Sequence, residues 1–225
     1  LQRKHCKWDR YQILQCYMVM GGIPFYLSLI DPRQSLVQNV DRLFFSHGGI
    51  MRGEFDELYN ALFSNAELYI SVVKALAQHH DGMTRTEISK VIGANGGTLT
   101  RVLTNLERCD FISRSQNFGC KTKDTIYRLM DFYTLFYYKF IAQDTSGDEQ
   151  WWSHNFESRL VSTWQGLTFE IVCLMHTDCI KKALGISGMA TEVSSWRKVA
   201  DDKQRGGQID LVIKRADRIV HLCEM

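Results

Sequence analysis

Residues 83–116, MTRTEISKVIGANGGTLTRVLTNLERCDFISRSQ, decide the fold of the middle of this chain. Thr84 and Glu87 have the Thr-x-x-Glu spacing of a capping box, in which each of the two side chains binds the backbone of the other residue, so a helix begins here. The glycine-rich turn at 93–97 ends this helix and leads into a second one. That second helix is amphipathic, with an apolar stripe formed by Leu99, Val102, Leu103 and Leu106.

A helix is predicted before this stretch and a pair of strands after it. The segment ELYISVVKALAQHH (67–80) has helical periodicity and stops before Gly82. The strand-like segments FISRSQ (111–116) and TIYRLMD (125–131) flank the polar tip NFGCKTKD. The order of helix, helix, tight turn, helix and two-stranded wing is that of a winged helix-turn-helix.

A winged helix that reads DNA places the second helix of its helix-turn-helix in the major groove. In this chain that helix is Thr98 to Arg108. The residues expected to face outward there, as candidates for base or phosphate contacts, are Thr98, Thr100, Arg101 and Asn105. The wing would contact phosphates through Arg114, Lys121 and Lys123. The alternative is a packing module with ordinary solvated lysines, because Glu107 and Asp110 dilute the basic face.

Glycines and polar breaks divide the rest of the chain. Residues 1–62 contain four helical patterns, interrupted by glycine pairs at 21–22 and 48–49. The aromatic segment DFYTLFYYKFI (131–141) is expected to pack between units, and DTSGDEQ (144–150) reads as a linker. We therefore predict an α+β, mostly α chain with a helical unit (1–62), a winged helix with its aromatic helix (63–143) and a last domain (150–225).

The last domain is predicted to combine one long helix with three strands. WQGLTFEIVCLMHTDCIKKALGI (164–186) reads as a single buried helix that ends at Gly185. Strands are expected around MATEVSSW (189–196), in QIDLVIKR (208–215) and in RIVHLCEM (218–225). The last two segments form a hairpin.

Each strand of this hairpin carries one acid near its open end. Unbulged pairing centred on Asp217 places Asp210 opposite Glu224. Opposed carboxylates with apolar neighbours repel each other, and a bound Mg²⁺ or Mn²⁺ would offset this repulsion and activate a water. The alternative is that the two acids lie at exposed strand ends and never meet.

Composition and missing motifs exclude several classes. There is no Walker phosphate loop, no dinucleotide glycine fingerprint and no signal peptide or membrane-length apolar run. Seven cysteines without a paired framework indicate reduced thiols, and we expect a soluble cytoplasmic protein. Cys173, His176 and Cys179 are spaced by three residues, which favours structural positions in a helix core over a zinc site. The net charge of +2 neither requires nor excludes a DNA partner.

Several of these segments together resemble a known family. GGIPFYLSLID (21–31), TRTEI (84–88), WQGLTFE (164–170) and the closing hairpin are similar to the C-terminal two thirds of the archaeal-type, AAA-like ATPases of bacteria and archaea. The resemblance covers nearly the whole chain and implies that the ATP-binding domain precedes it, with residues 1–62 resembling the ATPase lid. The lid match is carried by Gly21, Gly22, Pro24, Tyr26 and Leu27.

The C-terminal domain of that family resembles PD-(D/E)xK nucleases of the restriction-endonuclease type. The resemblance maps the metal-binding acids onto Asp210 and Glu224 and the helix acid onto Glu170. It thereby makes these three acids the catalytic candidates. Gln208, beside the motif, is a further polar candidate for the site. The lysine of the motif would fall one residue beyond Met225, so we expect a truncated domain that is inactive in this chain.

The expected function is that of the C-terminal part of a prokaryotic ATPase, which binds DNA through the winged helix and carries a nuclease-like domain. The alternative is a non-catalytic module that couples the ATPase to a protein partner.

Overall fold

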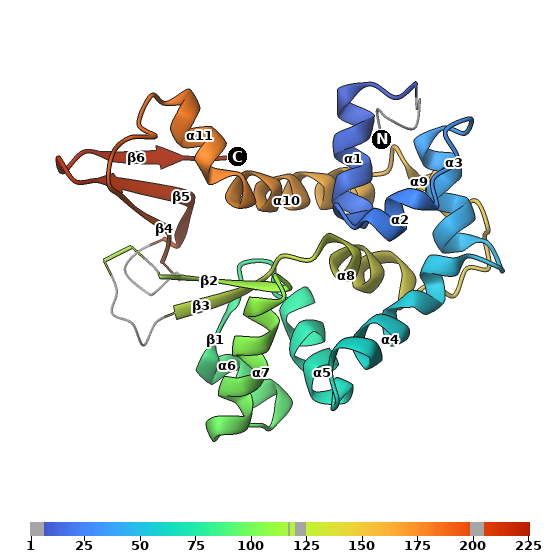
Figure 1. Ribbon diagram of the computed structural model, residues 1–225, viewed down its shortest axis with the longest axis horizontal. Coiled ribbons are helices and arrows are strands. Elements are labelled where there is room, and N and C mark those ends of the chain that lie inside the picture. The colour runs from blue at the N-terminus through green and yellow to red at the C-terminus, as the bar shows by residue number, and fades with distance from the viewer. Residues whose placement is uncertain (1–6, 117, 120–124, 199–204) are drawn as a thin grey trace.

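A computed structural model describes residues 7–116, 118–119, 125–198 and 205–225. These residues form an α+β fold with many helices and two three-stranded antiparallel sheets (Figure 1). The helices of the N-terminal half lie together, and the long helix α10 runs from them to the second sheet (Figure 1). No helix in the described ranges is both long and apolar enough to cross a bilayer.

Breaks between the N-terminal helices occur at the two predicted glycine pairs, and a capping box that was not predicted starts the first helix. A capping box formed by Asp9 and Gln12 starts the first helix, and Gly21, with φ 67°, ends it. A π-helical turn, η2, continues α3, because the N–H of Ser46 donates to the carbonyl of Asp41 five residues earlier. The elements are α1 (Arg10–Met20), α2 (Pro24–Ser28), α3 (Leu36–Val40), η2 (Asp41–Phe45) and α4 (Ile50–Leu62).

The middle of the chain has the predicted order of helices and strands, with one short strand added. The Thr84–Glu87 capping box starts α6, and the predicted apolar stripe of α7 is buried. Met83 and Thr84 form the added strand, β1, which pairs with β3 to give the sheet order β1-β3-β2. The elements are α5 (Ala66–Ala77), β1 (Met83–Thr84), α6 (Arg85–Ile92), α7 (Gly96–Arg108), β2 (Ile112–Gln116) and β3 (Thr125–Leu129).

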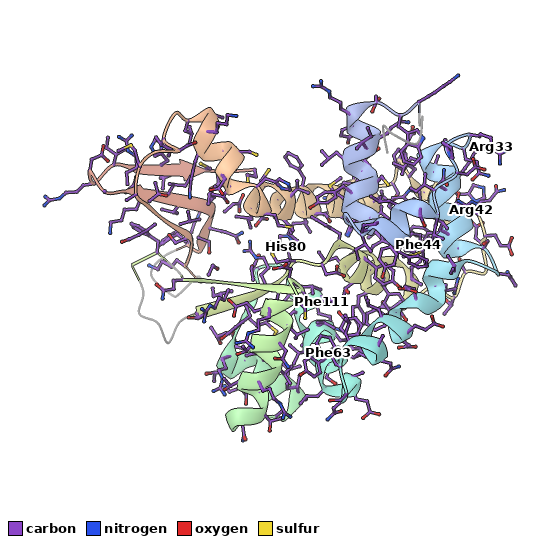
Figure 2. All side chains as sticks on the ribbon, viewed as in Figure 1. Arg33, Arg42, Phe44, Phe63, His80 and Phe111 are labelled. Carbon is purple, nitrogen blue, oxygen red and sulfur yellow. The ribbon has the colours of Figure 1, made fainter. Side chains whose placement is uncertain are left out.

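Aromatic side chains bind these parts together. Phe63 at the end of α4 and Phe111 before β2 lie with ring centroids 6.1 Å apart, at the junction of the helices and the first sheet (Figure 2). Phe136 contacts five aromatic rings among the described residues, with centroid distances of 4.8 Å to Phe44 and 5.1 Å to Trp152. The elements concerned are α8 (Phe132–Phe136), η4 (Tyr137–Ile141) and α9 (Trp151–Asn155).

The same hydrophobic core continues across the expected linker. It includes Phe136 and Phe140 before residues 144–150, and Trp152 and Trp164 after them. The aromatic segment packs inside this shared core. The domain boundary at 144–150 stays a prediction, and the residues on its two sides share one core.

The last part of the chain corrects one prediction. The single helix expected over 164–185 is wrong, because His176 adopts a non-helical backbone (φ −109°, ψ 30°) and its ring Nδ1 lies 2.8 Å from the carbonyl oxygen of Val172. The segment forms two helices, and the second has no buried residue. The elements are α10 (Arg159–Met175), α11 (Thr177–Ala183), β4 (Thr191–Lys198), β5 (Gly207–Arg215) and β6 (Val220–Cys223), with sheet order β4-β5-β6.

Candidate functional site

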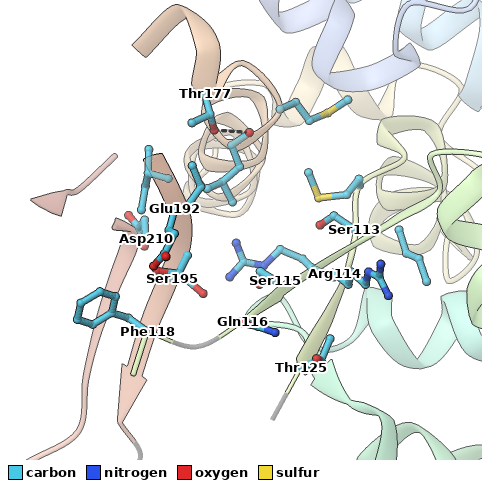
Figure 3. A pocket seen from close by; sticks show the side chains of 18 of the residues that line it. Ser113, Arg114, Ser115, Gln116, Phe118, Thr125, Thr177, Glu192, Ser195 and Asp210 are labelled. Carbon is cyan, nitrogen blue, oxygen red and sulfur yellow. Dashed lines mark hydrogen bonds between the residues drawn. The ribbon is translucent and has the colours of Figure 1, made fainter. Parts of the chain in front are cut away.

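A cleft of about 1290 Å³ lies between the two sheets. Its walls come from β2 and β3 on one side and from β4 and β5 on the other, and the junction of α10 and α11 closes one end (Figure 3). The sheets meet where the N–H of Phe118 donates to the carbonyl of Ser195 at 2.7 Å. The register of β4 shifts between Ser194 and Trp196, so this carbonyl belongs to a β-bulge.

Asp210 of β5 lines this cleft and is 8% exposed. Its Oδ1 accepts a hydrogen bond from Gln208 Nε2, and its Oδ2 accepts one from the backbone N–H of Met225, both at 3.1 Å. Gln208, a polar candidate of the sequence, is therefore a direct partner of this carboxylate. Both carboxylate oxygens are engaged by neutral donors of the same hairpin.

The predicted hairpin register is confirmed, but its ladder ends before the two acids. Leu211 pairs with Cys223, and the next pairs, up to Lys214 with Val220, continue in the register that is centred on Asp217. Strand β6 stops at Cys223, and Glu224 beyond it is exposed. The pairing of Asp210 with Glu224 is not part of the ladder.

Glu170 of α10 is buried and has a cationic partner. Its Oε1 accepts a hydrogen bond from Arg128 Nη1 at 3.0 Å, and its Oε2 lies 3.7 Å from His80 Nε2. His80 itself lies between α10 and the first sheet (Figure 2). Burial raises the pKa of Glu170; the charges of Arg128 and His80 oppose this shift, and that of Asp210 adds to it. Through its hydrogen bond with Arg128, Glu170 joins α10 to strand β3.

These contacts test whether the three acids fit a divalent metal. Such an ion requires oxygen ligands that converge on one point. Glu170 is paired with Arg128, Asp210 receives backbone and amide donors, and Glu224 is exposed. Within the described ranges no group of three or more His, Cys, Asp or Glu side chains is placed to hold a metal. The arrangement does not provide a preformed Mg²⁺ or Mn²⁺ site.

The predicted core positions of Cys173, His176 and Cys179 are not all observed. Cys173 is half-buried, and burial raises the pKa of its thiol. Cys179 is exposed, so the expectation of a core position is wrong for this residue. The reason is the break at His176, which ends α10 before the series is complete.

The predicted DNA-contacting residues of α7 differ in their surroundings. Thr98 and Arg101 are exposed. Thr100 is exposed as well, but its Oγ1 accepts from Arg85 Nη2 at 3.0 Å and donates to the carbonyl of Gly96. The prediction that Asn105 faces outward is wrong, because its Nδ2 donates to the Tyr69 hydroxyl at 2.8 Å and so packs against α5.

The wing residues are only partly described. Arg114 is exposed and its Nε lies 2.8 Å from Glu107 Oε1, so the acid that dilutes the basic face also pairs with the wing arginine. Lys121 and Lys123 lie outside the described residues.

Sequence reasoning missed Arg85, the first residue of α6. Its Nη2 donates to the carbonyl of Gly96 at 2.8 Å and to Thr100, so it joins the start of α6 to the start of α7. The only signal was an arginine directly after the capping threonine. The side chain of the N-cap residue Asn95 does not cap α7, and a Cβ added at Gly96 or Gly97 would meet nothing within 4 Å. There is therefore open space beside the Cα atoms of Gly96 and Gly97 in the first turn of α7.

Comparison of the chain with family models, with curated proteins and with solved structures found no match. A function for this chain therefore has to be inferred from its own residues and their geometry.

Proposed function

We propose that residues 66–129 form a winged helix that binds double-stranded DNA, in a chain that is the C-terminal part of a prokaryotic AAA-type ATPase. The order α5, α6, α7, β2 and β3 supports the winged helix, since it matches the order of that motif. The ATPase part rests on the sequence resemblance alone. Residues 1–62 would then correspond to the lid of the ATPase.

The observation that carries DNA binding is the open first turn of α7. Asn95 leaves the N–H groups of this turn without a side-chain cap, and the turn contains no acid. Free N–H groups and the positive end of a helix dipole attract phosphate oxygens. The glycines at 96 and 97 permit close approach of a ligand to this backbone.

Basic side chains lie beside this turn. Arg85 contacts Gly96 at its start, and Arg101 is exposed one turn further along α7. In the proposed complex α7 enters the major groove, with Thr98 and Arg101 toward the DNA and Arg85 toward a phosphate. Asn105 takes no part, because it is bound to Tyr69.

Fluorescence anisotropy with a labelled DNA duplex tests this proposal. Binding is expected at low salt, with affinity that falls as salt rises, because protein cations release counterions from DNA. Replacing Arg101 by Ala should weaken binding and lower the salt slope by about 1, which corresponds to one lost phosphate contact. The matched control is Arg10→Ala, which removes an exposed arginine from α1.

Two results would contradict the proposal. One is the absence of binding at low salt. The other is a salt slope in Arg101→Ala that equals those of the wild type and of Arg10→Ala.

The proposal does not extend to metal-dependent cleavage by the nuclease-like domain. The sequence resemblance motivates such an activity, but Glu170 is held by Arg128 and Glu224 lies outside the strand pairing. A cleavage assay with Mg²⁺ or Mn²⁺ is decisive. Cleavage that disappears in Asp210→Asn would show that the acids rearrange into a metal site.

A further inference from the structure

Two strand edges face each other across the cleft. β2 is an edge strand of the first sheet and β4 is an edge strand of the second. The bond from Phe118 to Ser195 is the one backbone hydrogen bond that joins the two sheets within the described ranges. Away from it the strands diverge, and the cleft lies between them (Figure 3). Unpaired strand edges present N–H and C=O groups to which an additional strand can bind.

The cleft also has an apolar part. Met130, Leu174, Met175 and Val193 line it. Met175 and Val193 are each 44% exposed, so a bound segment can cover apolar surface here. Alternate residues of an added strand point to opposite sides, so one set can cover these side chains.

The charges of the cleft disfavour a phosphate. Each basic side chain that lines it among the described residues is already paired with an acid: Arg114 with Glu107 at 2.8 Å, Arg128 with Glu170 at 3.0 Å, and Lys214 with Glu192 at 2.9 Å. Asp110 and Asp210 also line the cleft, and neither has a basic partner in the part of the chain that the structure describes. The uncompensated charge of the described lining residues is therefore negative, and a cationic group is attracted there.

We propose that this cleft binds an extended segment of a partner protein by strand addition. The segment pairs with the edge of β2 or β4, covers Met175 and Val193 with apolar side chains, and places a Lys or Arg near Asp210. Main-chain hydrogen bonds supply affinity in such complexes, and the side chains supply specificity. This function is separate from the DNA contacts proposed for Thr98, Arg101 and Arg85, because none of these three residues lines the cleft.

The test uses a labelled synthetic peptide of about ten residues in which Lys and Val alternate, a length that exceeds a typical strand. Its affinity for the whole chain is measured by fluorescence anisotropy at moderate salt. Three competitors are compared: the same peptide with Glu in place of Lys, the same peptide with alternate backbone amides N-methylated, and a single-stranded oligothymidine. The Lys peptide is expected to bind, and none of the competitors should displace it.

Two variants locate the site. Replacing Asp210 by Asn removes the charge but keeps the shape, and should weaken binding about tenfold, as loss of one favourable charge contact does. Ser113→Trp places a large side chain from β2 in the cleft. It should abolish peptide binding whether residue 210 is Asp or Asn. The matched control, Asp56→Asn, changes an exposed acid on α4 and should leave the affinity unchanged. Circular dichroism verifies that each variant is folded.

The proposal is overturned if no peptide binds, or if both cleft variants bind as the wild type does. Displacement of the peptide by oligothymidine, with loss of oligothymidine binding in Ser113→Trp, would assign the cleft to nucleic acid instead. DNA binding through α7 is tested independently by Arg101→Ala, so the two proposals can fail separately.

Discussion

Arg128 of β3 and Glu170 of α10 form a buried ion pair, with 3.0 Å between Nη1 and Oε1. Their side chains are 10% and 7% exposed. The pair joins the first sheet to the helix that leads to the second sheet, and it lies close enough to Asp210 for that charge to affect Glu170. A residue predicted from the sequence as a catalytic acid is thereby a structural contact between β3 and α10.

Replacing Arg128 by Met is expected to lower the free energy of unfolding by about 3 to 5 kcal/mol, because Glu170 is then left buried without its cationic partner. Urea unfolding at neutral pH measures this loss. In the double variant Arg128→Met/Glu170→Leu both charges are gone, and most of the stability should return. A double variant as unstable as Arg128→Met alone would show that packing, and not charge, causes the loss.

The stability of the protein should depend on the protonation of Glu170. Burial raises the pKa of Glu170 in the folded state above its unfolded value of about 4.3. The resulting contribution to stability is complete below the unfolded pKa and is lost as pH rises through the raised, folded pKa. As pH is lowered from 7 towards 4, the wild type should therefore gain stability relative to Glu170→Gln. Urea unfolding over this range checks the sign, and a difference that is flat or of opposite slope would contradict the assignment.

Gly82 is expected to tolerate alanine far less well than Gly96. Both have positive φ, 81° and 59°, which costs an alanine about 1 to 2 kcal/mol. At Gly82 the added Cβ would also lie 2.6 Å from Ile126 Cγ2 and from the carbonyl oxygen of Tyr127, whereas at Gly96 it meets nothing. Thermal unfolding should show a clearly larger loss for Gly82→Ala. Equal losses would mean that the turn moves away from β3.

Phe136→Ala is expected to cost about 3 to 5 kcal/mol, the range for a large aromatic side chain removed from a core. The control Leu160→Ala removes an exposed side chain of α10 and should change stability by less than about 0.5 kcal/mol. Because Trp152 and Trp164 belong to the same cluster, tryptophan fluorescence and circular dichroism should report one shared transition. Separate transitions would place a domain boundary between Phe136 and these tryptophans.

Local signals predicted most of the secondary structure. The capping box of Thr84 and Glu87, the apolar stripe from Leu99 to Leu106 and the register of the β5–β6 hairpin are all confirmed. Each of these features depends on residues that are near in sequence, and caps and short turns hold them in place. For the same reason the α+β class could be predicted without a structure.

The candidate site was predicted less well, because its geometry depends on distant residues. Asn105 has the spacing of an outward position, yet the Tyr69 hydroxyl, 36 residues away in sequence, binds it. Glu170 has the position of a helix acid, yet Arg128, 42 residues away, neutralises it. Arg85 carried no recognised signal, because its role depends on the packing of α6 against α7.

The sequence by itself determined many of the helix and strand ends, since caps, glycines and apolar periodicity act over a few residues, although it missed the break at His176 and the short strand β1. Only the tertiary structure decided which side chains meet. It paired Glu170 with Arg128, left Glu224 outside the ladder and placed the edges of β2 and β4 on opposite sides of one cleft. The physical reason is that ion pairs, burial and strand edges are set by contacts between distant segments, which the spacing of residues along the chain does not encode.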